Sequence, residues 1–294
     1  MACIGIDVGG SSVKAVVVSR AGERIADENR SFDPEVKMQF ADTIAVVVSE
    51  LELAHGNAES IGLSAPGLAA RDEMSIAYLP NRLDGMEGLE WRSFLKRSFP
   101  VPVLNDAHAA LMGEVWLGAA KGLANVIMLT LGTGVGGAAM VDGNLLRGHT
   151  GKAGHLGHVS LDVCGDPDIC NTPGSLEVMI GNCTIAERSG DRFATTHELI
   201  AAVEAGNSHA ERVWLTSVRA LACAIGSFTN VLDPEVAVIG GGIARAGELL
   251  FEPLRKEVDS VEWKVCGHDL RIVPAELGEF AGAYGAAWHA IREV

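Results

Sequence analysis

Two glycine-rich turns are candidate phosphate-binding sites. The first, Gly9-Gly10-Ser11, joins the apolar runs 4–8 and 13–18, and the second, 132–137, follows the apolar run 126–129. Backbone N–H groups can close on phosphate oxygens where no side chain intervenes, so a row of glycines suits a nucleotide. Either turn alone is more often an ordinary structural turn. Two similar hairpins far apart in one chain indicate two related lobes, each offering a phosphate loop to one cleft.

Asp106 is the candidate general base. It follows Asn105 at the end of a short apolar run, 99–104, and precedes the Ala- and Leu-rich stretch 107–117, which is typical of a helix. A carboxylate there can take the proton of a hydroxyl that attacks a phosphate, and such a base typically contributes about 10²–10⁴-fold. The other interpretation is that Asp106 only caps the helix, the commonest role of Asp in this setting.

The first half of the chain predicts strands around one long helix. Residues 2–8 and 13–19 form a hairpin. A helix is expected to begin at Asp33-Pro34, because Asp33 can cap it and Pro34 suits the first helical position, and to end before Gly56. Apolar residues at steps of three and four give this helix one buried face: Val36, Phe40, Ile44, Val47 and Leu51.

The second half alternates helices with strands. Helices are expected over 174–189, 194–205, 208–231, 246–257 and 280–292, and strands over 234–239 and 269–274. Strands that alternate with helices indicate an α/β fold. Residues 147–177 are irregular and rich in Gly, His and Asp, which is typical of a functional loop, so we expect substrate contacts there.

Composition narrows the classes of function. The chain has 294 residues, 48% of them hydrophobic, so it can bury a large core, and two lobes are expected. A net charge of −15 argues against nucleic acid as a partner. The apolar runs are too short for a predicted membrane span. Six scattered cysteines favour a reduced, cytoplasmic protein.

Six short motifs in this order resemble the ROK family (repressors, open reading frames and sugar kinases). They lie at 7–14, 105–107, 132–137, 157–158, 174–177 and 232–242. The resemblance implies the two-lobed α/β fold of actin-like ATPases (ribonuclease H-like), with a cleft between the lobes. One lobe would span 1–117, rejoined by the final helix at about 278–294, and the other 118–277. Many members of this family work as homodimers, so a homodimer is expected.

The implied activity is that of an ATP-dependent sugar kinase, similar to a glucokinase, with ATP and Mg²⁺. The alternative is a sugar-binding sensor of the same fold without kinase activity. Family repressors carry a DNA-binding domain ahead of the first hairpin, and the start of the first motif at Asp7 favours the kinase. A third interpretation, an acetate kinase-like or activator ATPase, is disfavoured by Asn105-Asp106 and the motif 174–177.

The resemblance also implies roles for individual residues. Asp7 would hold Mg²⁺ through water. The phosphates would face Gly9, Gly10, Ser11, Gly132, Thr133, Gly134 and Gly136, and Lys14 would either approach them or face solvent. The adenosine would face Gly240, Gly241 and Gly242, for which a plain strand-to-helix turn is an equally good interpretation. The expected sugar contacts are Gly67, Asn81, Asn105, Asp106, His155, His158 and Glu177.

Two departures from the family pattern concern specificity and metal. His155 stands where the family usually has Glu, which leaves the identity of the sugar open. Many members bind structural zinc through one His and three Cys. Here Asp168 stands at the first cysteine position and Ser175 at the third, Cys170 keeps the second, and Cys164 could substitute only after rearrangement. Because a structural zinc site needs four good ligands, no structural zinc is predicted.

Overall fold

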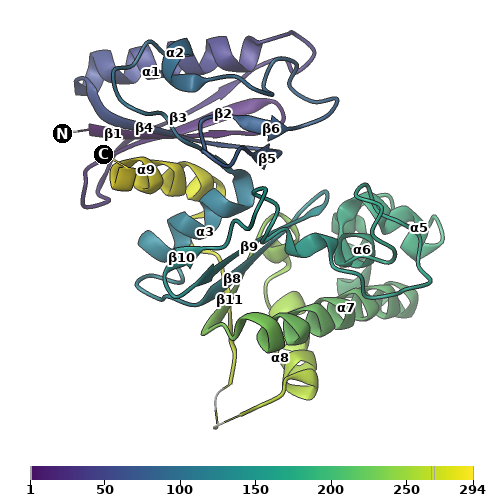
Figure 1. Cartoon of the computed structure of the whole chain (residues 1–294). Helices are drawn as coiled ribbons and strands as arrows, with labels where there is room; N and C mark the ends of the chain where they lie inside the picture. Colours follow the sequence, from purple (N-terminus) through teal and green to yellow (C-terminus); the bar gives the residue numbers. More distant parts are fainter. Residues whose placement is uncertain (1, 266, 268, 294) are drawn as a thin grey trace. The chain divides into compact units, whose positions relative to one another are not determined.

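The computed structural model describes residues 2–265, 267 and 269–293, so Cys266 lies outside the described residues. The chain divides into two compact units (Figure 1). Unit 1 combines residues 1–122, 145–153 and 276–294, and unit 2 combines residues 123–144 and 154–275. Each unit has a mixed five-stranded sheet, with helices packed around it.

The sheet of unit 1 has the strand order β3-β2-β1-β4-β7. Its strands are β1 (Ala2–Val8), β2 (Ser12–Val18), β3 (Arg24–Ser31), β4 (Ala58–Ala65) and β7 (Val103–Asn105). The hairpin predicted at the start of the chain is confirmed, because β1 and β2 pair antiparallel. Strands β4 and β7 add to β1 in parallel. A small β5 (Leu68–Ala69) and β6 (Ile76–Tyr78) pair separately.

Helix α1 (Gln39–His55) begins later than the sequence predicts. Met38, in the left-handed conformation, is its N-cap. Asp33 instead closes a turn, in which its Oδ1 accepts the N–H of Glu35 at 3.0 Å. The expectation that Asp33 caps the helix is therefore wrong, and Val36, placed ahead of the helix, is 50% exposed. The other four predicted core residues of this helix are buried, and it ends at Gly56 as expected.

The C-terminal helix α9 (Ala281–Glu293) packs on the sheet of unit 1 and on α3 (Asp106–Trp116). Glycines in the strands permit the close approach. A Cβ on Gly5 of β1 would lie 1.9 Å from the carbonyl oxygen of Ala283, and one on Gly62 of β4 would lie 2.0 Å from that of Ala286. Figure 1 shows α9 beside α3 and below the sheet. The helix thereby brings its own first turn next to the end of β1.

The sheet of unit 2 has the order β10-β9-β8-β11-β12. Its strands are β8 (Val126–Leu131), β9 (Val135–Val141), β10 (Asn144–Leu145), β11 (Val236–Gly240) and β12 (Arg271–Pro274). Strands β8 and β9 form the predicted glycine-turn hairpin, and β11 and β12 join in parallel. Its longer helices are α6 (Thr196–Glu204), α7 (Ser208–Leu232) and α8 (Glu248–Val261).

The prediction of a single helix over 174–189 is wrong. The segment forms α4 (Leu176–Ile180), a short 3₁₀ turn (Asn182–Thr184) and α5 (Ile185–Ser189). Gly181 is extended, and the next two backbone N–H groups bond to the glycine turn of the β8–β9 hairpin instead of to α4. A long-range contact thus interrupts a helix that the local sequence favours.

Helix α7 is long and apolar enough, by length and composition, to cross a membrane. A single such helix is weak evidence for a span, because the core helix of a globular domain passes the same test. Here Trp214, Leu221 and Phe228 are buried, and the helix packs against α4, α6 and α8. These contacts are those of a core helix.

Residues 145–153, which the sequence places with the second lobe, cluster with unit 1. Two contacts hold them there. Arg147 forms an ion pair with the buried Glu73, and His108 Nε2 of α3 lies 3.0 Å from the carbonyl oxygen of Ala153. Both contacts join residues far apart in sequence, which explains why the sequence pattern does not show this boundary.

Candidate active site

Asp7 is a desolvated carboxylate of unit 1. It lies near the end of β1, where Ser64 Oγ of β4 donates a hydrogen bond to its Oδ1 at 2.5 Å. Gly282 of α9 leaves room for it, since a Cβ there would lie 2.7 Å from the same oxygen. Burial raises the pKa of Asp7 to about 6; the charge of Asp106 adds to this, while Ser64 and Lys14 oppose it. A carboxylate in this state gains from a nearby cation.

Lys14 lies opposite Asp7 in the β1–β2 register. Its Nζ pairs with Glu279 Oε2 at 3.1 Å, and its side chain is 23% exposed. Lys14 is therefore engaged with the short 3₁₀ turn before α9, rather than facing solvent alone.

Asn105 and Asp106 have different roles at the start of α3. The Asn105 side chain caps the helix, accepting the N–H of Ala107 at 3.0 Å and that of His108 at 3.3 Å. Its Nδ2 donates to Asp106 Oδ1 at 2.8 Å and to the carbonyl oxygen of Gly67 at 3.0 Å. Asp106 itself is exposed, and its Oδ1 also accepts the N–H of Ala107. The cap thus rests mainly on Asn105, and three predicted sugar contacts meet here.

Gly67 is a position that only glycine fits. Its φ is +97°, and a Cβ there would lie 2.6 Å from the carbonyl oxygen of Tyr78. Together with the Asn105 bond, this fixes the backbone of Gly67 beside Asp106. The sequence-based expectation of a close backbone approach at Gly67 therefore has a matching geometry within unit 1.

The first glycine turn borders a hollow in unit 1. The N–H of Gly9 donates to the carbonyl oxygen of Ser12 at 2.8 Å, which closes the turn and leaves Gly10 and Ser11 exposed. Gly10 and Asn81 both line a hollow of about 840 Å³, which the loop 79–87 borders. Two residues predicted for different ligands thus share one concave surface.

Glu177 supports the second glycine turn in unit 2. It lies in α4, is buried, and its Oε2 accepts the N–H of Val135 at 2.9 Å. A Cβ on Gly134 would lie 2.2 Å from this oxygen, so the contact requires glycine there. Gly136 follows in β9, paired with Thr130 of β8. The carboxylate predicted to contact sugar also holds the predicted phosphate turn.

Two further hydrogen bonds fix the same turn. The carbonyl oxygen of Gly132 accepts the N–H of Asn182 at 3.0 Å, and that of Thr133 accepts the N–H of Cys183 at 2.8 Å. Both donors lie in the 3₁₀ turn that interrupts the predicted helix. With its carbonyl groups turned onto this segment, the glycine turn is preorganised.

The three glycines at the end of β11, Gly240 in the strand and Gly241 and Gly242 after it, differ in their structural requirements. Gly241 has a φ of +89°, and a Cβ there would lie 2.3 Å from the carbonyl oxygen of Leu131, so the turn itself requires glycine. A Cβ on Gly240 would lie 3.2 Å from the Ala275 side chain. Gly242 differs: among the described residues, leaving out its two chain neighbours, no heavy atom would lie within 4 Å of a Cβ at this position. Gly242 is therefore the glycine that the fold does not explain.

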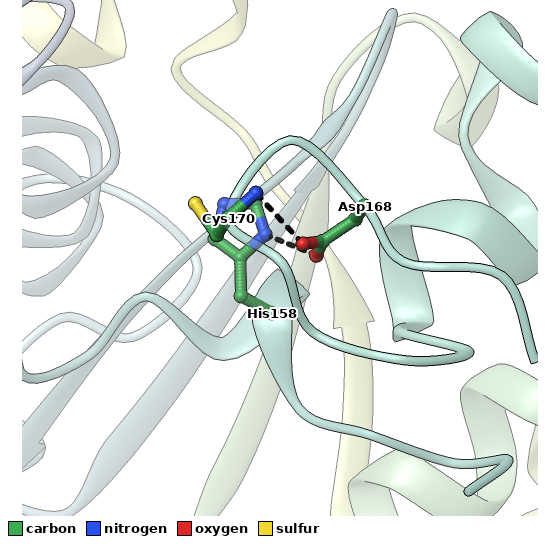
Figure 2. A group of neighbouring side chains, drawn as sticks. All are labelled: His158, Asp168 and Cys170. Atoms are coloured by element: carbon green, nitrogen blue, oxygen red, sulfur yellow. Dashed lines mark hydrogen bonds and ion pairs between the residues drawn. The ribbon is translucent and has the colours of Figure 1, made fainter.

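His155 precedes a short 3₁₀ turn (Leu156–His158) that packs on β9, and His158 is its last residue. A Cβ on Gly157 would lie 1.8 Å from the carbonyl oxygen of Val135, so the turn rests directly on the strand. His158 Nδ1 lies 2.7 Å from Asp168 Oδ2, and Figure 2 shows the two side chains facing each other. His158 is thereby oriented by a carboxylate.

Comparison with known proteins identifies the family. The model of the ROK family matches residues 3–293. The chain belongs to the ROK family. It is 32% identical to a glucokinase of Thermotoga maritima, over 97% of this chain and 95% of that protein. Xylose repressors also match, at 24% identity or less.

Solved ROK structures agree with the fold. A ROK hexokinase from Thermus thermophilus has a TM-score of 0.85 and 30% identity, covering 100% of this chain and 99% of that one. A ROK family glucokinase from Streptomyces griseus was solved in complex with glucose and AMPPNP. It has a TM-score of 0.81 and 25% identity, covering 99% of this chain and 100% of that one. The expected actin-like α/β fold is therefore confirmed.

The zinc site that the ROK resemblance implies does not fit the residues present. His158, Asp168 and Cys170 do lie together, with their potential ligand atoms within 4.8 Å of one another. However, His158 Nδ1 and Asp168 Oδ2 are 2.7 Å apart, a hydrogen-bond distance. Two ligands of one tetrahedral zinc, each about 2.0–2.2 Å from the metal, lie roughly 3.3 Å apart or more. The cluster is built around a hydrogen bond.

The predicted site residues fall into two groups. Unit 1 holds Asp7, Gly9, Gly10, Ser11, Lys14, Gly67, Asn81, Asn105 and Asp106, and unit 2 holds the others. Within each unit, hydrogen bonds or shared surfaces link several of them. Sequence reasoning missed Ser64 and Gly282, which shape the surroundings of Asp7, and the role of Asp168. Only spatial contacts identify these residues, although Gly282 in a helix is a weak signal of close packing.

Proposed function

We propose that this chain transfers the γ-phosphate of ATP to a hydroxyl of a hexose, with glucose as the first candidate. Its class, ATP-dependent sugar kinase, follows from glucokinase and hexokinase relatives that match nearly the whole chain. The acceptor and the residue roles are the proposal. The observation that carries them is the Asn105–Asp106 pair, in which Asn105 caps the helix and leaves an exposed carboxylate at its start.

In this proposal Asp106 is the general base. The sugar oxygen attacks the γ-phosphorus, the bond from that phosphorus to its bridging oxygen breaks, and ADP leaves. Asp106 takes the hydroxyl proton, and Asn105 Nδ2 holds the carboxylate in place at 2.8 Å. Because the transition state of phosphoryl transfer needs positioning and charge neutralisation, a fixed carboxylate fits the reaction.

The nucleotide is assigned to the glycine turns and the end of β11. Exposed Gly10 and Ser11 would offer backbone N–H groups from unit 1, and Thr133 and Gly134 would offer them from unit 2. The N–H of Gly132 already donates to the carbonyl oxygen of Gly134 at 2.9 Å. Asp7 would hold Mg²⁺, which supplies charge neutralisation for the phosphates when bound. The raised pKa of Asp7 supports this role, since a cation restores the ionised form that burial disfavours. Gly242 would leave room for adenosine.

Sugar selection is assigned to polar groups in both units. Gly67, Asn81, Asn105 and Asp106 would contribute from unit 1, and His155, His158 and Glu177 from unit 2. A hydrogen-bonding site rejects analogues that lack the matched hydroxyl, so each of these groups affects specificity. His155 replaces a carboxylate acceptor with an imidazole, and we expect this change to shift the preferred sugar.

The test is a coupled assay of ADP release with Mg-ATP and a panel of sugars. The panel contains glucose, mannose, fructose, allose, glucosamine, N-acetylglucosamine and N-acetylmannosamine. We expect sugar-dependent release with one or two of them. Glucose binding by calorimetry without any turnover across the panel would contradict the proposal and support a sugar-binding sensor of the same fold.

A further inference from the structure

The segment 158–175 is organised around one carboxylate. Asp168 has a side chain only 1% exposed. Its Oδ1 accepts the N–H groups of Cys170 at 2.8 Å and Thr172 at 2.9 Å. Its Oδ2 faces His158 Nδ1 at 2.7 Å, and the Ser175 hydroxyl also bonds to this carboxylate. The partners come from both ends and from the middle of the segment.

These four partners occupy the acceptor sites of the carboxylate. An ionised carboxylate offers about four lone-pair positions on its two oxygens. Asp168 uses them on an imidazole, a hydroxyl and two backbone N–H groups, so a metal would have to displace one of these bonds. Figure 2 shows Cys170 beside the pair, with its thiol pointing away from the Asp168 carboxylate. The cluster is complete as a hydrogen-bond network.

We propose that Asp168 takes the place of a structural metal as the centre of this segment and acts as a positioning residue for His158 and Glu177. This inference rests on the proposed function. The bond from Nδ1–H to Asp168 fixes one tautomer of His158 and leaves Nε2 of the neutral ring as an acceptor for a ligand hydroxyl. A sugar hydroxyl is a suitable donor.

The second arm of the network runs through Ser175. Its Oγ accepts the N–H of Val178 and so caps α4, the helix that carries Glu177. Glu177 in turn holds Val135 at the glycine turn. Backbone bonds reinforce the arm, since the N–H of Leu176 donates to the carbonyl oxygen of Val159 at 3.0 Å. Asp168 therefore connects the predicted sugar side and the predicted phosphate side of unit 2.

The test compares Asp168→Asn with Asp166→Asn in the full-length protein. Asp166 is an exposed carboxylate two residues earlier in the same loop, so it is a matched control for charge. For Asp168→Asn we expect the sugar KM to rise by about tenfold or more, because partners that orient a functional His typically matter at that scale. Ser175→Ala should give a smaller rise, and Asp166→Asn should leave the KM unchanged.

Two measurements decide the inference without kinase activity. The ¹⁵N spectrum of the ring should show His158 protonated at Nδ1 in the wild type and lose that signature in Asp168→Asn. Purified wild type should hold little zinc, about 0.1 per chain or less, and its melting temperature should not change with chelator. Stoichiometric zinc, or equal KM values for the two Asn variants, would overturn it. Absence of turnover with the expected ring spectrum would count against the proposed function alone.

Discussion

The two sheets share a strand order and differ in what stands at the ends of their strands. In each unit an antiparallel hairpin is extended by two parallel strands. Strands β1 and β7 of unit 1 lead to the carboxylates Asp7 and Asp106. In unit 2, β8 takes the place of β1 and β11 takes the place of β4, and these two strands lead to the glycine turns 132–134 and 240–242.

The same sheet architecture can thus serve two chemical tasks. A desolvated carboxylate and an exposed one suit a metal ion and a proton, which are positively charged. Turns without side chains present backbone N–H groups and leave space, which suits an anionic phosphate and a flat base. We therefore expect substitutions of the two carboxylates of unit 1 to change the chemical step, and substitutions in the glycine turns of unit 2 to change nucleotide affinity.

The largest effect should come from Asp106→Asn. Without its base the reaction should lose about 10²–10⁴-fold in kcat, while glucose binding by calorimetry stays within a fewfold of wild type. Asp142→Asn is the control, because Asp142 is an exposed turn residue of unit 2 with a φ of 51° that Asn also tolerates. Near-normal turnover of Asp106→Asn would end its assignment as base.

Because burial raises the pKa of Asp7, the free energy of unfolding should fall as the pH rises. Its folded-state pKa of about 6 lies above the ordinary 3.8, mainly through burial. Between these values the folded state binds more protons than the unfolded state, so the free energy of unfolding falls, by about 3 kcal/mol in total.

This loss in the free energy of unfolding should be complete above about pH 6 and absent in Asp7→Asn. Urea denaturation from about pH 4 to about pH 8, with EDTA and no nucleotide, measures it. Asp7→Asn should also lose most of its activity, because the amide cannot replace the carboxylate at Mg²⁺. An identical pH dependence in both proteins would contradict the assigned burial.

Substitutions of the two glycines after β11 should separate an effect on stability from an effect on ATP binding. Gly241→Ala forces a side chain into a left-handed backbone against Leu131, so we expect a loss of about 2–4 kcal/mol in the free energy of unfolding. Gly242→Ala should change stability by less than about 0.5 kcal/mol and raise the KM for ATP severalfold, with the sugar KM unchanged. An unchanged ATP KM would remove Gly242 from the nucleotide site.

Local patterns predicted the elements that carry the site. Both hairpins and helices α3 and α7 follow from apolar periodicity and turn residues that lie next to each other in the chain. The predicted N-terminus of α1 is wrong. Asp33 accepts the N–H of Glu35 in a turn, and the same residue types could equally have formed a helix cap. Short-range signals do not distinguish these two outcomes.

Long-range contacts account for the remaining differences. The break at Gly181 follows from bonds to residues 132 and 133, and the placement of 145–153 follows from Glu73 and His108. The roles of Ser64 and Gly282 around Asp7 are likewise set by elements distant in sequence. A single sequence identifies the polar residues, but the partners that tune their charge appear only when the strands and helices pack.

The most direct test of the central claim is detection of the phosphorylated sugar itself. Wild type and Asp106→Asn would be incubated with Mg-ATP and the best acceptor of the panel, and the products followed by ³¹P NMR. We expect the wild type to form a sugar monophosphate in equal amount to ADP, and Asp106→Asn to form almost none. ADP with inorganic phosphate and no sugar phosphate, or equal sugar phosphate from both proteins, would contradict it.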